Sequence, residues 1–216
     1  MKINADLSKR AVVHSETLDW VPSPLPGVHR RMLDRDGEEV ARATSVVRYA
    51  PGGAFSPHRH DAGEEFLVLE GVFSDESGDF PRGMYVRNPP GSRHKPSSEP
   101  GCTILVKLRQ IPDDDREFVR LDTRNERDWQ VFDESQSALE LHRTAHEHVR
   151  ILRWQAGAKL SERHFPKGAE YFVLEGGFED DDGVYDRGSW LRLPAGSRQT
   201  PRSRTGCVAY LKTGHL

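Results

Sequence analysis

Four side chains have the types and the spacing of a metal-ligand set. His58 and His60 are two residues apart, so on a β-strand both imidazoles project from the same face, and Glu64 follows after a turn at Ala62-Gly63. His94 comes from a later segment. Imidazole nitrogens and a carboxylate oxygen suit a divalent transition-metal ion of borderline hardness, such as zinc, iron, manganese, nickel or cobalt. The sequence therefore predicts a metal site made of His58, His60, Glu64 and His94, and it does not suggest a nucleophilic triad.

The elements that must position these ligands are short β-strands. Side chains alternate with a period of two in segments such as 46–50, 66–69 and 104–106. Clusters of turn residues separate these segments, and the 216 residues include 19 Gly and 14 Pro. Many short, evenly spaced strands are typical of barrels and jelly rolls. We therefore expect an all-β protein.

An internal repeat determines the expected domain organisation. Residues 48–107 align without a gap to residues 153–212, at a constant offset of 105, with 24 identities in 60 positions. This similarity indicates a duplication, and a duplication indicates two domains of one fold. We expect two tandem double-stranded β-helix (jelly-roll) barrels. The N-terminal barrel covers residues 1–111 and holds the metal site, and a degenerate C-terminal barrel covers residues 112–216.

The second copy lacks the metal ligands. At the offset of 105 the four ligand positions are occupied by Arg163, Phe165, Ala169 and Gln199. His164 would reach a ligand position only after a one-residue slip, which turns a strand inside out. Two interpretations of this barrel stay open. The favoured one is a filled barrel that supports the first, and the other is a pocket in which Arg163 and Gln199 hold a small anionic ligand.

Two longer motifs resemble those of a known superfamily. They read Gly52-x5-His58-x-His60-x3-Glu64-x6-Gly71 and Gly83-x5-Pro89-x-Gly91-x2-His94-x3-Ser98. Both resemble the cupin motifs, with Ser98 in place of the usual Asn, and because the similarity extends over both copies the chain resembles a bicupin. Residues 58–76 in particular are similar to the cupin domain of ChrR-type anti-sigma factors. That resemblance implies zinc as the ion held by His58, His60, Glu64 and His94, with iron, manganese or nickel as alternatives.

Two functions are compatible with this resemblance. The first is a ChrR-like metal-binding protein with a sensory or regulatory role. The alternative is a metal-dependent dioxygenase or isomerase of the cupin type, with a small organic substrate in the N-terminal barrel. No catalytic residue is identified, and no cofactor besides the metal ion is expected. The sequence contains neither the CxxC motif nor the helical zinc domain through which ChrR-type proteins hold a sigma factor, which leaves sigma-factor binding without support.

Composition excludes several other classes of protein. The 31 Lys and Arg nearly balance the 34 Asp and Glu, which argues against binding to nucleic acid or to an anionic membrane. The longest apolar runs are far shorter than the roughly 20 residues that cross a bilayer. The first residues lack a signal-peptide core, so we expect a cytoplasmic protein. Cys102 and Cys207 are expected to be reduced, buried core residues, and a homodimer is compatible with the sequence.

Overall fold

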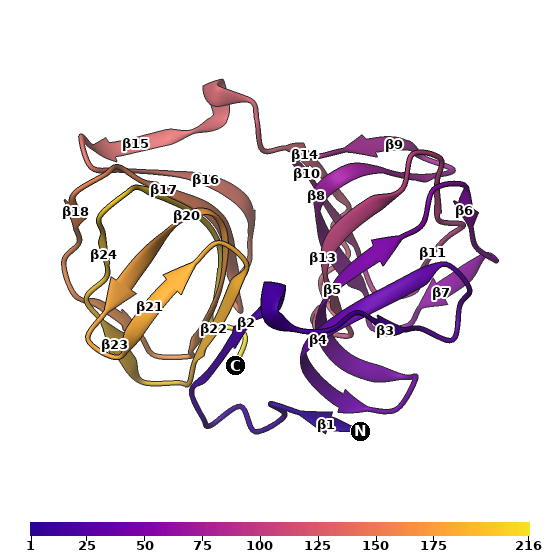
Figure 1. The fold of residues 1–216 in the computed structure, drawn as a ribbon, viewed down its shortest axis with the longest axis horizontal. Helices are drawn as coiled ribbons and strands as arrows, with labels where there is room; N and C mark the ends of the chain where they lie inside the picture. The colour runs from indigo at the N-terminus through magenta and orange to yellow at the C-terminus, as the bar shows by residue number, and fades with distance from the viewer. The chain divides into compact units, whose positions relative to one another are not determined.

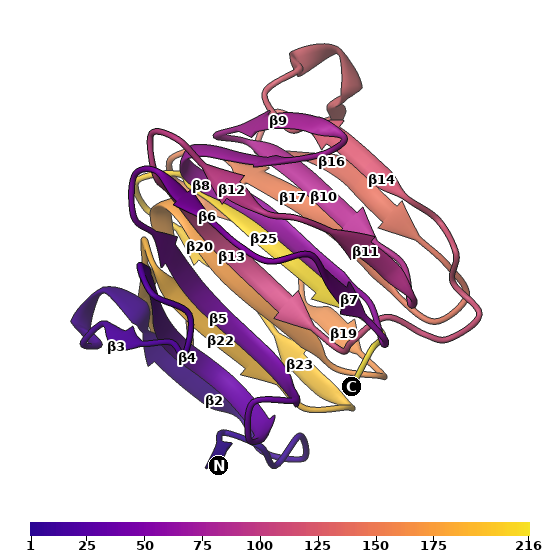
Figure 2. The same ribbon diagram turned by 90° about the vertical axis from the view of Figure 1, so that its right-hand side faces the viewer.

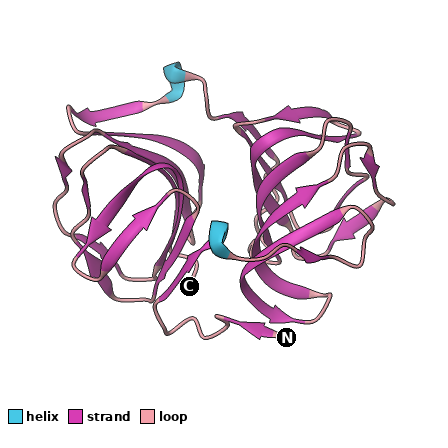
Figure 3. Ribbon diagram, viewed as in Figure 1, coloured by secondary structure: helices cyan, strands magenta, loops and turns pink.

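A computed structural model describes all 216 residues, and its elements are strands joined by loops and turns, with two short 3-10 turns, η1 (Ser15–Thr17) and η2 (Glu126–Asp128) (Figure 3). The chain divides into two compact units. The first unit consists of Met1–Ala5 and Leu18–Arg124, and the second consists of Asp6–Thr17 and Asn125–Leu216. No helix is long and apolar enough to span a membrane. The all-β expectation is therefore confirmed.

The first unit is an antiparallel jelly roll (Figure 1). Its larger sheet has the strand order β1-β4-β5-β13-β8-β10-β14, and β3, β6, β9 and β12 pair beside this path, while β7 pairs with β11. The strands are β1 (Lys2–Ile3), β3 (Val21–Pro22), β4 (Val28–Gly37), β5 (Ala41–Tyr49), β6 (Gly53–Ala54), β7 (His58–His60), β8 (Glu64–Asp75), β9 (Gly78–Pro81), β10 (Met84–Asn88), β11 (Ser92–His94), β12 (Ser97–Ser98), β13 (Cys102–Leu108) and β14 (Val119–Asp122).

The second unit repeats this arrangement, except that β3 has no counterpart there. Its larger sheet has the order β15-β16-β17-β25-β20-β22-β2, and β19 pairs with β23. The strands are β2 (Ala11–His14), β15 (Gln130–Asp133), β16 (Gln136–Arg143), β17 (His148–Trp154), β18 (Ala158–Lys159), β19 (Arg163–Phe165), β20 (Ala169–Asp180), β21 (Gly183–Asp186), β22 (Ser189–Leu193), β23 (Ser197–Gln199), β24 (Arg202–Ser203) and β25 (Cys207–Thr213). The prediction of two jelly-roll barrels is confirmed.

One long strand in each unit takes part in both layers of the barrel. The first part of β8 pairs with β10 and β13, and its last part pairs with β9 and β12. Gly71 lies at this transition with a φ of 72°, and a Cβ there would overlap the backbone carbonyl oxygen of Gly101. Gly176 stands in the same relation to Gly206 in the second unit. Only glycine fits such a position, which explains why the repeat keeps it.

The observed units differ from the predicted domains in two segments. The prediction divided the chain into residues 1–111 and 112–216, but β14 lies beyond residue 111 and pairs with β10 of the first unit, while β2 pairs with β22 of the second unit. Each barrel therefore completes the edge of its larger sheet with a strand that precedes the other repeat. A sheet edge with unpaired backbone groups accepts any strand that can reach it, and sequence proximity does not reveal which one does.

Each barrel has an aromatic interior. Phe66, Phe73 and Phe80 belong to the buried core of the first unit, and the second unit has Tyr171, Phe178 and Tyr185 at the equivalent positions. Cys102 and Cys207 are also buried in these cores as free thiols, as expected. This aromatic packing gives the predicted metal ligands of the first unit a rigid support.

Candidate metal centre

Two short strands and the start of a third place the predicted ligands. Strand β7 pairs with β11 so that His58 lies opposite His94 (Figure 2). His58 and His60 alternate along β7 with the exposed Arg59 and share one face. The chain then turns at Gly63, whose N–H donates to the His60 carbonyl oxygen at 3.2 Å, and Glu64 begins β8.

The structure groups the three predicted histidines, whose ligand atoms lie within 4.8 Å of one another, and places Glu64 beside two of them, His60 and His94. The rings of the three histidines form a nearly regular triangle, with centroid distances of 4.8, 4.8 and 5.0 Å. Nε2 of His60 lies 2.9 Å from Nε2 of His94. Oε2 of Glu64 lies 3.5 Å from the first of these nitrogens and 3.6 Å from the second. His94 and Glu64 are buried, His60 is partly buried, and His58 is exposed, so the site is open on the side of His58.

Neighbouring groups orient these ligands. His58 Nδ1 lies 3.1 Å from the Ser56 carbonyl oxygen, and His94 Nδ1 lies 3.3 Å from Oδ2 of Asp75. When Nδ1 donates its proton to such an acceptor, Nε2 keeps its lone pair for a metal ion. Both rings are therefore held in the tautomer that a metal site needs.

The carboxylate of Glu64 is held by a chain of two hydrogen bonds. Asn88 donates to Glu64 Oε2 at 3.2 Å through its side-chain amide. The oxygen of that amide accepts a hydrogen bond of 2.7 Å from Arg120. The Arg120 guanidinium also stacks over the ring of Phe80, at 5.3 Å from its centroid. This chain ties the orientation of Glu64 to β10 and β14.

The electrostatics of the site differ from one histidine to the next. Burial lowers the pKa of His60, and the nearby Glu64 carboxylate only partly opposes this effect. Burial also lowers the pKa of His94, but the hydrogen bond to Asp75 and the surrounding carboxylates outweigh it, and the pKa is raised overall. Burial would raise the pKa of Asp75, yet hydrogen bonds from His94 and Ser77 lower it overall. Asp75 is thus an ionised partner for His94.

The donor atoms fit a single transition-metal ion. Two donors bound to one ion at about 2.0 to 2.1 Å lie about 2.9 to 3.4 Å apart in octahedral or tetrahedral geometry. The observed separations of 2.9, 3.5 and 3.6 Å are close to this range. Nε2 of His60 and Nε2 of His94 also face each other, and an ion between them would satisfy both lone pairs. His60, His94 and Glu64 therefore fit one divalent ion as two nitrogen donors and one oxygen donor, and the ligand nitrogen of His58 lies within 4.8 Å of the other two histidine nitrogens.

Sequence reasoning missed the residues behind the ligands. Asp75, Asn88 and Arg120 were not identified as parts of the site. One signal could have revealed the first of them, because Asp75 and Asp180 are identical at the offset of 105. Arg120 has no such signal, since it lies in the segment between the aligned repeats.

The equivalent positions of the second unit form a different arrangement. Arg163 lies opposite Gln199 in the β19–β23 pair, which is the register expected from the offset, and His164 is exposed. Gln199 donates through its amide to Oδ2 of Asp180 at 2.7 Å. Asp180 is the equivalent of Asp75, and Gln199 is the equivalent of His94. The second unit therefore keeps the carboxylate partner although the histidine has been replaced. Ala169 replaces the carboxylate of the first unit.

Glu65 and Glu170 support the barrels from the face opposite the ligands. Oε2 of Glu65 accepts hydrogen bonds of 2.7 Å from both Tyr85 and Arg87, and all three side chains are buried. In the second unit Glu170 pairs with His215 at 2.7 Å. These buried partners give both glutamates a structural role in their barrels.

Comparison with solved structures shows what the fold resembles. A candidate dioxygenase from Nostoc punctiforme superposes with a TM-score of 0.79 at 15% identity, covering 97% of this chain and 84% of its own. YlbA from E. coli gives a TM-score of 0.74 at 16% identity, covering 98% and 93%. A Bacillus subtilis oxalate decarboxylase variant gives 0.63 at 14% identity, covering 94% and 76%. At these identities the similarity concerns the fold alone.

Comparison with protein families is more specific. A search of curated protein sequences finds no match. The model of the ChrR Cupin-like domain, in contrast, matches the chain twice, over residues 8–112 and 117–216. Together the two matches cover nearly the whole sequence and coincide with the two repeats. The chain therefore belongs to the ChrR cupin-like domain family and is a bicupin that carries two such domains in tandem.

Proposed function

We propose that the first unit binds one divalent transition-metal ion through His58, His60, Glu64 and His94. The observation that supports this most strongly is the convergence of Glu64 Oε2 and two histidine Nε2 atoms within 2.9 to 3.6 Å, at nearly the spacing that one ion requires. The partners of His58 and His94 leave the correct nitrogen free for the ion.

The role that we propose for this ion is sensory or regulatory, with zinc as the expected metal. The support is the family match, because ChrR cupin-like domains cover both halves of the chain. Zinc also accepts four ligands of this kind as a closed tetrahedron. In that case occupancy of the site would report metal availability.

A second candidate function is a cupin-type dioxygenase or isomerase. Two observations favour it: the exposure of His58 at the open side of the site, and the fold similarity to the candidate dioxygenase of Nostoc punctiforme. A bound iron, manganese or nickel ion would supply Lewis acidity and open coordination positions for a small substrate. Glu64 is the only carboxylate in the ligand set and is anchored by Asn88.

Elemental analysis of protein purified without added metal tests the proposed site. We expect one equivalent of a single divalent metal per chain, and we expect His58→Ala and His94→Ala to lose it. His164→Ala is the matched control, because that histidine is exposed on β19, at the position equivalent to Arg59. If His58→Ala and His94→Ala keep a full equivalent, or if His164→Ala loses it, the proposed site is wrong.

The identity of the metal then separates the two functions. Stoichiometric zinc, without oxygen uptake in the presence of diketones, flavonols or thiols, would support the regulatory role. A redox-active ion whose spectrum changes with one of these compounds, together with oxygen uptake that is lost in His94→Ala, would support the enzyme instead. Measurements of metal content, absorption and oxygen uptake on one preparation are sufficient.

A further inference from the structure

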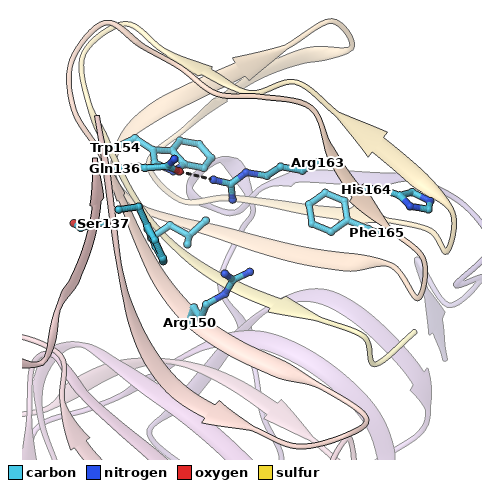
Figure 4. A pocket seen from close by; sticks show the side chains of 9 residues that line it. Gln136, Ser137, Arg150, Trp154, Arg163, His164 and Phe165 are labelled. Carbon is cyan, nitrogen blue, oxygen red and sulfur yellow. Dashed lines mark hydrogen bonds between the residues drawn. The ribbon is translucent and has the colours of Figure 1, made fainter. Parts of the chain in front are cut away.

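The second unit has an open cavity that the metal site does not use. Its volume is about 450 Å³, which lies within the usual range for pockets that hold small molecules. The core of the second barrel is filled by buried side chains, as the favoured expectation has it, and the cavity lies beside this core and opens to solvent. The lining includes Gln136, Arg150, Leu152, Trp154, Arg163 and Phe165, and Figure 4 shows these side chains around the cavity.

Two guanidinium groups face this cavity without a carboxylate partner. Arg163, from β19, donates to Oε1 of Gln136 at 3.1 Å and stacks over Trp154 at 5.1 Å from the ring centroid (Figure 4). Arg150, from β17, has a buried Nε atom with no hydrogen-bond partner. Burial lowers the pKa of Arg150, and the positive charge of Arg163 lowers it further. Two partly buried cations in one cavity are unfavourable unless a ligand supplies negative charge.

One more hydrogen-bond donor lines the cavity, and a second lies close to the two arginines. Trp154 is almost completely buried, and its indole Nε1 has no hydrogen-bond partner. Tyr171 is fully buried close to Arg163 and Arg150, and burial raises its pKa to about 12, so it stays protonated. The sequence alternative paired Arg163 with Gln199 as ligand-binding residues, but Gln199 does not line the cavity, and its amide donates to Asp180. The second side chain available to bind an anion beside Arg163 is therefore Arg150.

The cavity occupies the region that corresponds to the metal site of the first unit. Arg163 stands at the position of His58, and Arg150 stands at the position of Ser45. The second copy thus has two cationic side chains where the first has a predicted metal ligand and a serine. The apolar side chains of Leu152, Trp154 and Phe165 form the rest of the wall.

We propose that this cavity binds a small organic carboxylate. The planar guanidinium groups of Arg150 and Arg163 match the two oxygens of a carboxylate, and the apolar wall accommodates the hydrocarbon part of such a ligand. The Trp154 indole N–H, which is buried and has no hydrogen-bond partner, is a further donor in the lining. This binding site is independent of the metal proposed for the first unit.

Calorimetric titration with benzoate and with benzamide tests the proposal on the unmodified protein. The two probes have nearly the same shape, but only benzoate is charged. We expect benzoate to bind with a Kd below about 1 mM and benzamide to bind at least tenfold more weakly. In a ¹⁵N correlation spectrum, benzoate should shift the indole N–H signal of Trp154, which is assigned by its absence in Trp154→Phe.

Substitutions of the two arginines test whether benzoate binds in this cavity. Arg150→Gln and Arg163→Gln should each weaken benzoate binding at least tenfold while the protein stays folded by circular dichroism. Arg153→Gln is the matched control, because Arg153 lies on the same strand, pairs with Glu126 and does not line the cavity. It should bind benzoate like the unmodified protein.

Four results would overturn the proposal. They are the absence of benzoate binding, equal affinity for benzoate and benzamide, unchanged affinity in both cavity variants, and displacement of benzoate by inorganic phosphate at lower concentration than by other carboxylates. The last result would identify an oxyanion site of a different class. The comparison of the two probes needs no variant, so it decides the question even if a substitution prevents folding.

Discussion

The hydrogen bond between Asp75 and His94 provides a direct test of how the candidate metal centre is organised. Asp75 accepts at Oδ1 from the Ser77 N–H at 2.7 Å, and its Oδ2 faces His94 Nδ1 at 3.3 Å. If Asp75→Asn keeps the first bond, its amide NH2 group will face Nδ1. That arrangement favours the tautomer with a proton on Nε2, and a protonated Nε2 cannot bind a metal ion.

The size of the effect follows from the geometry. A hydrogen bond to a charged group contributes about 1.5 to 3 kcal/mol. Because 3.3 Å is a long distance for such a bond, we expect the lower part of this range, about 1.5 to 2 kcal/mol. That corresponds to a metal affinity reduced about ten- to thirtyfold, within the range known for partners of metal-binding histidines.

The assay is competition for Zn²⁺ between the protein and a chromophoric chelator at constant pH. Asp180→Asn serves as the matched control, because Asp180 holds Gln199 at the equivalent place in the second unit. Its zinc affinity should equal that of the unmodified protein. An affinity of Asp75→Asn within about twofold of the unmodified protein, or equal losses in the two variants, would refute the reasoning.

Three other predictions concern stability and reactivity. Glu65→Ala removes a buried acceptor of Arg87, so the free energy of unfolding in urea should fall by about 3 kcal/mol. Gly71→Ala forces a Cβ onto a backbone carbonyl oxygen at a φ of 72°, and the same measurement should show a loss of roughly 2 to 4 kcal/mol. Burial raises the pKa of Cys102 to about 11 and that of Cys207 to about 12, so at pH 8 both thiols stay protonated, and Ellman's reagent should detect them only after denaturation.

Each of these predictions has an internal control. Glu70→Ala changes an exposed neighbour on the same strand as Glu65 and should cost little, so an equal loss would contradict the assigned role of the buried pair. Gly52 also has a positive φ, of 73°, but no atom lies within 4 Å of the Cβ that Gly52→Ala would add. This variant therefore measures the cost of backbone strain without the cost of steric overlap. If Gly52→Ala is as destabilised as Gly71→Ala, overlap is not the cause. Rapid modification of either thiol in the native state would show that its core opens readily.

Local and repeated signals explain which parts of the structure could be predicted. The spacing of His58 and His60 reports a strand face directly, and the offset of 105 relates the two barrels, so the fold and the convergence of the ligands followed from the sequence. Asp75 was missed because a carboxylate behind a ligand has no spacing rule of its own. Arg150 was missed because it lies just outside the aligned repeat. Only the fold shows that its guanidinium group lines the same cavity as Arg163.

The pairing of β2 with β22 has a consequence for synthesis of the chain. Val13 pairs with Trp190, so β2 can pair only after a further 177 residues have been synthesised. The first barrel can close once β14 has emerged, whereas the backbone groups of β2 stay unpaired until β22 has been synthesised. Contacts so distant in sequence form slowly, and exposed strand edges promote association between chains. A ribosome that stalls before Ser189 would therefore leave one finished barrel carrying an unpaired β2.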